Sequence, residues 1–182
     1  MDKEEARQHL YEHVLQPALE EQVSVVARLF HDQQERLVAE WIESFRGMCM
    51  QIAQMQRRGE KAPIGFIHYS VLRTSVLEGT CTYQIEAYSD DWYWDPAECF
   101  ARYDARWALQ GLTALIELLY ERRKMYMGML HAADVERMVL QHIGAFSQFV
   151  TALARDRLRG KSGLREVASF TDAWIEIQLR QS

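Results

Sequence analysis

Aromatic and acidic residues are concentrated in one short stretch, SDDWYWDPAE, at positions 89–98. Trp92, Tyr93 and Trp94 lie between aspartates in this stretch. More aromatic residues lie close to it in the sequence: Tyr83, Tyr88, Phe100, Tyr103 and Trp107. Aromatic rings contribute large apolar areas to ligand pockets and to protein interfaces. The stretch is therefore the first candidate for a binding site. The alternative interpretation is that one or two of its rings only fasten a β element to the helices.

Arg73 interrupts an otherwise apolar run, IGFIHYSVLRTSVL, at positions 64–77. If this run is a buried helix, the guanidinium group must be paired with a carboxylate. An arginine in such a place can also anchor an anionic ligand. The structural pair is the favoured interpretation. Its candidate partners are Asp90, Asp91, Asp95 and Asp104.

The histidines do not form a recognisable metal site. His9 and His13 are spaced i and i+4 beside Glu5, a spacing that can hold a metal ion, but nothing nearby completes the ligand set. We interpret them as part of a solvated helix face. His68 and His142 could each be a ligand or a general base, and a hydrogen-bonded core histidine is the favoured interpretation for both. The sequence therefore predicts no metal and no cofactor.

Recognised catalytic motifs are absent from the sequence. There is no Gly-rich phosphate loop, no GxSxG, no HExxH and no paired-carboxylate motif. Active sites assemble in space, so this absence does not exclude an enzyme, but it favours a non-catalytic protein. Cys49, Cys81 and Cys99 are odd in number and form no CxxC, which favours free thiols in a reducing compartment.

Length and charge limit the classes of protein to which the chain can belong. The 182 residues suit one domain, residues 1–182, and the formal net charge of -5 gives no overall footprint for nucleic acid. The N-terminal sequence is charged from its second residue and does not resemble a signal peptide. The longest uncharged run, Met138 to Ala154, falls short of a membrane span. We therefore expect a cytoplasmic protein that binds neither membrane nor nucleic acid.

Apolar periodicity predicts a chain that is mainly α-helical. Pro17 should kink or break the first helix, and Asp32 with Glu35 has the spacing of a capping box for the second, although one long helix is an alternative. Residues 64–77 fit a helix or a strand, and we select the helix. Asp95 and Pro96 have the sequence of a helix start. The predicted helices are 4–30, 32–58, 64–77, 96–127 and 135–158.

One segment has the alternation of a strand. In Thr80–Ser89, Cys81, Tyr83, Ile85 and Ala87 alternate with more polar residues. The C-terminal segment Ala173–Gln181 alternates as well, and we expect the two segments to pair antiparallel; residues 92–94 are another candidate partner. The predicted fold is a bundle of four or five helices with this small β element.

The first functional hypothesis is a non-catalytic interaction or regulatory module that acts through a protein partner or by self-association as a homodimer. It rests on the missing motifs, the amphipathic helices and the surplus of aromatic residues and methionines. The alternative is a small-molecule binding protein or enzyme with an aromatic-lined pocket near Trp92–Tyr103. In either case the predicted binding residues are Arg73, Tyr83, Trp92, Trp94 and Tyr103.

Overall fold

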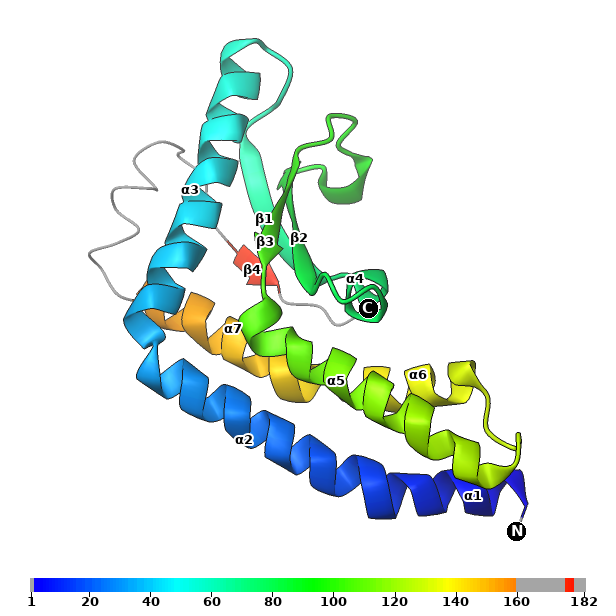
Figure 1. Cartoon of the computed structure of the whole chain (residues 1–182). Helices are drawn as coiled ribbons and strands as arrows, with labels where there is room; N and C mark the ends of the chain where they lie inside the picture. Colours follow the sequence, from blue (N-terminus) through cyan, green and yellow to red (C-terminus); the bar gives the residue numbers. More distant parts are fainter. Residues whose placement is uncertain (1, 160–175, 179–182) are drawn as a thin grey trace. The chain divides into compact units, whose positions relative to one another are not determined.

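The computed structural model describes residues 2–159 and 176–178 (Figure 1). It divides into two compact units, each built from three segments of the sequence. Unit 1 contains residues 1–32, 73–81 and 105–150, and unit 2 contains residues 33–72, 82–104 and 151–182. In the described residues, no helix combines the length and apolar character needed to span a membrane.

Unit 2 is a helix packed on a β-sheet. Helix α3 (Gln34–Arg57) is followed by β1 (Ile64–Val71), β2 (Thr82–Ser89) and β3 (Phe100–Asp104). The sheet order is β3-β2-β1-β4, where β4 is Glu176–Gln178. Strand β2 pairs antiparallel with β1 and β3, and β4 pairs parallel with β1.

Helix α3 runs alongside one face of this sheet and packs on it (Figure 1). The ring of Trp41 stacks on Phe45 at 5.6 Å and on Tyr69 of β1 at 5.9 Å, measured between ring centroids. Alternate strand residues point to this face because side chains along a strand alternate between its two sides. The buried strand residues here are Ile67, Tyr69, Val71, Tyr83, Ile85, Ala87 and Tyr103. We call the opposite side of the sheet the outer face.

Unit 1 is helical. It contains α1 (Lys3–Leu10), a π-helical segment (Tyr11–Leu15), α2 (Gln16–Asp32), α4 (Arg73–Leu77), α5 (Arg106–Arg122), a 3-10 segment (Arg123–Tyr126), α6 (Ala132–Leu140) and α7 (Ile143–Arg159) as far as residue 150. Helix α5 contacts α2, α4 and α6. A Cβ atom on Gly111 would lie 2.8 Å from the Phe146 ring and 3.3 Å from Cβ of Gln22, so this glycine allows neighbouring helices to approach α5 closely.

The irregularity predicted at Pro17 takes the form of a π-helical turn just before it. The Gln16 N–H donates to the Tyr11 carbonyl, an i→i−5 bond. Proline lacks an N–H and its ring crowds the preceding turn, so a wider turn here accommodates Pro17 without breaking the helix.

One predicted helix is wrong, and a second begins later than predicted. Residues 64–77 form strand β1 followed by the short helix α4, because Ile67, Tyr69 and Val71 alternate into the core. The helical spacing of Ile64, Ile67 and Val71 is coincidental. The predicted helix starting at Pro96 begins ten residues later, at Arg106, after strand β3. The predicted capping residue Asp95 has a different role, described below.

Other boundaries also differ. Asp32 ends α2 and does not cap α3, whose N-cap is Gln33. The predicted helix 135–158 is two helices, α6 and α7, separated at Gln141–His142. The prediction that Thr80–Ser89 is a strand is confirmed as β2, but its predicted pairing with Ala173–Gln181 is wrong. The neighbours of β2 are β1 and β3, and the described part of the C-terminal segment pairs with β1. The rest of that segment lies outside the described residues.

Candidate interaction site

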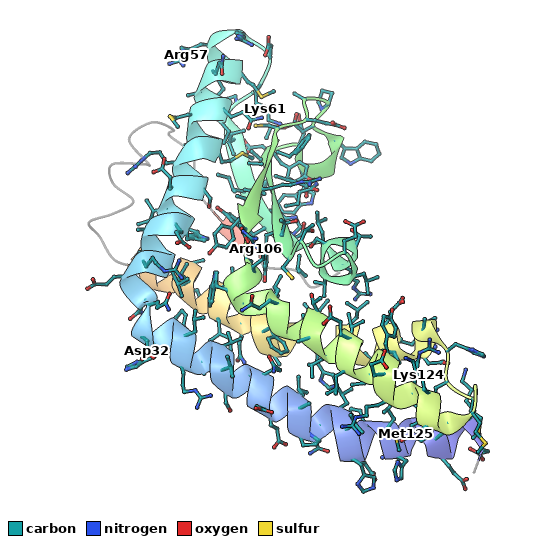
Figure 2. All side chains as sticks on the ribbon, viewed as in Figure 1. Asp32, Arg57, Lys61, Arg106, Lys124 and Met125 are labelled. Carbon is teal, nitrogen blue, oxygen red and sulfur yellow. The ribbon has the colours of Figure 1, made fainter. Side chains whose placement is uncertain are left out.

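The loop that joins β2 to β3, residues 89–98, is anchored by a buried ion pair. Lys61 Nζ lies 2.7 Å from Asp95 Oδ2, and the exposed fractions of the two side chains are 0% and 3%. Lys61 also donates to the Ala97 carbonyl. It lies on the segment that joins α3 to β1 (Figure 2). One side chain from outside the loop therefore holds two positions of the loop.

The Asp95 carboxylate ties the two ends of the loop together. It accepts a hydrogen bond from the Ser89 N–H at 2.6 Å and one from the Ala97 N–H at 3.0 Å. Burial alone would raise the pKa of Asp95, but the hydrogen bonds from Lys61, Ser89 and Ala97 outweigh it and lower this pKa to about 2. Asp95 is thus a charged acceptor at the base of the loop and not the cap of a helix.

Gly65 of β1 lets the start of the loop lie directly on the sheet. A Cβ atom at this position would lie 3.2 Å from the Cα and N atoms of Asp90, and closer still to its carboxylate. The pairing of β1 with β2 is irregular at the same point, between Ile64 and Phe66. A side chain at position 65 would therefore displace the loop.

Trp92 closes the loop over the outer face. Its ring lies edge-on to Phe66, with ring centroids 4.2 Å apart, and stacks on Tyr88 at 5.7 Å. Its backbone φ is 54°, a left-handed conformation that costs energy for a bulky side chain. The contacts with Phe66 and Tyr88 offset this cost, so the Trp92 ring is used for packing within the unit.

Trp94, two residues later, is 90% exposed. Two backbone hydrogen bonds, Trp94 N–H to the Asp91 carbonyl and Asp95 N–H to the Trp92 carbonyl, fix a 3-10 turn at this position. A large aromatic ring in water on a fixed turn contributes almost nothing to the stability of the folded chain. Among the side chains of this loop that the structure describes, it is a large apolar one that another molecule can reach.

The outer face beside the loop is aromatic at one end and polar beyond it. Register places Phe66 opposite Tyr88, and places His68, Glu86 and Phe100 in the next row. Phe100 is 52% exposed. Across a sheet, residues in adjacent rows of one face lie within reach of aromatic side chains. Phe66, Tyr88, Trp92 and Phe100 therefore share one end of the face.

His68 is buried in the middle of this face, with 8% of the residue exposed. Its Nδ1 lies 3.6 Å from Glu86 Oε2, beyond hydrogen-bond distance. Neither ring nitrogen has a hydrogen-bond partner in the part of the chain that the structure describes. The prediction of a hydrogen-bonded core histidine is therefore not met at this position.

The electrostatic character of the region is acidic. Between Arg73 and Arg102 the sequence contains six aspartates and glutamates and neither lysine nor arginine. Asp90, Asp91 and Glu98 of the loop are exposed. The charge of Asp95 is compensated by Lys61, so the net charge of the loop itself is the negative charge of Asp90, Asp91 and Glu98.

The five predicted site residues are not in one place. Tyr83 and Tyr103 face each other across β2 and β3, with ring centroids 6.5 Å apart, but both are buried on the side of the sheet that packs against α3. Trp92 packs on the outer face. Arg73 is exposed in α4 of unit 1, so it does not need the carboxylate partner expected of a buried arginine. Of the five residues, Trp92 and Trp94 belong to the loop.

Sequence reasoning missed Lys61 and Phe66. The alternation of Phe66, His68 and Ser70 with Ile67, Tyr69 and Val71 was an available signal for a half-buried strand. No local signal connects Lys61 with Asp95, which lies 34 residues later.

The histidines considered as ligands have other surroundings. The Nδ1 atom of His9 is hydrogen-bonded to the Tyr126 hydroxyl at 2.8 Å, and the His9 and His13 ring centroids are 4.4 Å apart. His142 stacks on Tyr11, and burial lowers the pKa of His142. Over residues 2–159 and 176–178, no group of three metal-ligating side chains is found.

Comparisons of the chain with known protein families, with curated proteins and with solved structures found no match.

Proposed function

We propose that the chain is a non-catalytic protein-interaction module that presents Trp94 to a protein partner. The observation that carries this proposal is the contrast between a ring that is 90% exposed and a loop base whose ion pair is buried from solvent. Tryptophan is enriched among the residues that dominate interface energies. A loop held in advance in its bound shape also loses little conformational entropy on association.

The test is identification of a binding partner together with a Trp94→Ala variant. The chain is used to capture proteins from extracts of its native cells, and each captured protein is then purified and its Kd measured. We expect at least one partner whose affinity falls by about tenfold or more in Trp94→Ala, the effect of losing about 1.4 kcal/mol of binding energy. Self-association is measured in parallel by sedimentation velocity, because a second copy of the chain is one such partner.

Met127→Ala is the matched control. Met127 is 92% exposed in unit 1, so this variant also removes an exposed apolar side chain but at a different place. It should leave the affinity unchanged. If every partner, including a second copy, binds Trp94→Ala as tightly as the unmodified chain, the proposal is wrong.

A second candidate function, small-molecule binding, is favoured by a pocket in unit 1. This pocket has a volume of about 200 Å³ and lies between α1 and α6. Its lining residues are Arg7, Gln8, Tyr11, Asp134, Arg137, Met138 and Gln141. Two guanidinium groups favour a small anion. Isothermal titration with inorganic phosphate or succinate, repeated on Arg137→Gln, tests it; no heat of binding would exclude these anions.

A further inference from the structure

We propose that the partner of the Trp94 loop is a cationic protein segment, and that an arginine or lysine of this segment lies over the Trp94 ring. This inference rests on the proposed function, because it names the class of partner for the same site. It is drawn from the charges of the loop, from the exposure of the Trp94 ring and from the apolar area beside the loop.

The charges favour a cation. The exposed carboxylates of Asp90, Asp91 and Glu98 belong to the same ten-residue loop as Trp94. Lys61, the lysine that binds this loop, is already paired with Asp95 in the buried ion pair, so it does not neutralise the exposed carboxylates. A positive partner would be attracted by this field and a negative partner repelled, which affects both the association rate and the choice of partner.

The exposed ring gives the cation a specific place to bind. The face of an indole ring carries negative potential and attracts a guanidinium or ammonium group within about 6 Å of its centroid. Nearby carboxylates add a charge-assisted hydrogen bond to the same cation. Trp92 cannot take this role in the same way, because its ring already packs against Phe66 and Tyr88.

The partner is inferred to be a segment of protein because apolar area adjoins the loop. Phe66, Tyr88, Trp92 and Phe100 share one end of the outer face, and Phe100 is half exposed. A free amino acid would not use this area. A chain of several residues can place one basic side chain at Trp94 and its apolar side chains along the face.

The experiment uses the full chain labelled with 5-fluorotryptophan and observed by fluorine NMR. The chain has five tryptophans, and the Trp94→Phe variant assigns the Trp94 signal. Three peptides with alternating glycine are titrated to millimolar concentration: one with arginine, one with glutamate and one with leucine. Buried Trp41 and Trp107 serve as internal references.

We expect the arginine peptide to move the Trp94 signal selectively and to saturate it. The dissociation constant should rise several-fold when sodium chloride is raised from about 0.02 M to about 0.3 M, because salt screens exposed charges. Asp90→Asn/Asp91→Asn should weaken binding about threefold or more, a loss expected for two exposed charges near the cation. Glu20→Gln/Glu21→Gln makes the same charge change in unit 1 and should have no effect.

The other outcomes would contradict the cationic partner. They would leave the proposed interaction function to be decided by its own experiment. A shift of Trp94 with the leucine or the glutamate peptide, but not with the arginine peptide, would show that the loop binds another class of partner; the interaction function would then survive. A uniform shift of all signals, or no shift with any peptide, would remove the cationic partner. The capture experiment with Trp94→Ala would still decide the interaction function.

Discussion

Two lysine–aspartate pairs, one in each unit, have nearly the same geometry in opposite surroundings. In unit 2, Lys61 lies 2.7 Å from Asp95, and both side chains are almost fully buried. In unit 1, Lys3 lies 2.8 Å from Asp134, and the exposed fractions of these side chains are 54% and 14%. Each aspartate also accepts backbone N–H groups: Asp95 from Ser89 and Ala97, and Asp134 from His131 at the start of α6.

The difference between the pairs is the cost of removing the lysine. An exposed ion pair contributes about 0–1 kcal/mol, because water and salt solvate either charge when it is left alone. A buried carboxylate that loses its cation has no such substitute. Lys61 is therefore required for the structure of the Trp94 loop, whereas Lys3 only supports a helix start that already has its backbone cap.

Lys61→Met should have the largest effect. Removal of one partner from a buried pair costs about 3–5 kcal/mol, so the free energy of unfolding should fall by that amount. Urea unfolding at neutral pH measures it. A loss below about 1 kcal/mol, the range of exposed pairs, would show that the two pairs are equivalent and would contradict the comparison.

The double variant Lys61→Met/Asp95→Asn is the control for this prediction. It removes the uncompensated charge and keeps one of the two side-chain oxygens, which can accept from either the Ser89 N–H or the Ala97 N–H but not from both, because these bonds end on different oxygens of Asp95. It should recover part of the stability lost in Lys61→Met. Equal loss in both variants would mean that the packing of the Lys61 side chain, and not the charge of Asp95, causes the effect.

Acid should weaken unit 2 through Asp95. The pKa of Asp95 is lowered from 3.8 to about 2 in the folded chain, so its contribution is complete above about pH 5 and is lost as the pH falls from there toward 2. The corresponding free energy is about 2 kcal/mol. Between pH 6 and pH 2, the unmodified chain should lose about this much more stability than Asp95→Asn, in which position 95 does not titrate. Parallel curves would contradict the lowered pKa.

Lys3→Met should have the smallest effect, a loss of about 0–1 kcal/mol. The Lys3 hydrogen bond is the largest cause that lowers the pKa of Asp134, and the His131 N–H is the next. The backbone cap of α6 remains in the variant, and salt should reduce the difference from the unmodified chain. Thermal unfolding at low and at moderate salt measures it, and a loss comparable with that of Lys61→Met would exclude a merely supporting role.

Regular patterns made part of the fold predictable. The stripe of Leu37, Trp41, Phe45, Met48 and Ile52 predicted α3, and the alternation of residues 81–87 predicted β2. Strand β1 was not predicted, because Ile64, Ile67 and Val71 recur at a helical spacing and residues 64–77 fit a helix as well as a strand. Asp95-Pro96 has the local signature of a helix start, but such a signature does not say whether the following residues continue as a helix.

The site was predictable only in its most visible part. Trp92 and Trp94 were identified because aromatic residues so close together are conspicuous in the sequence. Their opposite roles depend on the conformation of the loop, which is held by Lys61 and by Gly65 at a distance in the sequence. Phe66 became part of the site only through the register of β1 with β2, which no local pattern specifies.

The division of each unit into three separate segments has a consequence for synthesis of the chain. Unit 1 draws on residues 1–32, 73–81 and 105–150, so it is complete only after residue 150 has been made. Its first helices are therefore synthesised before the helices that cover them. The apolar faces of α1 and α2 stay exposed until α5 has been made. Unit 1 cannot fold completely before that point, and termination of synthesis before residue 150 leaves neither unit intact.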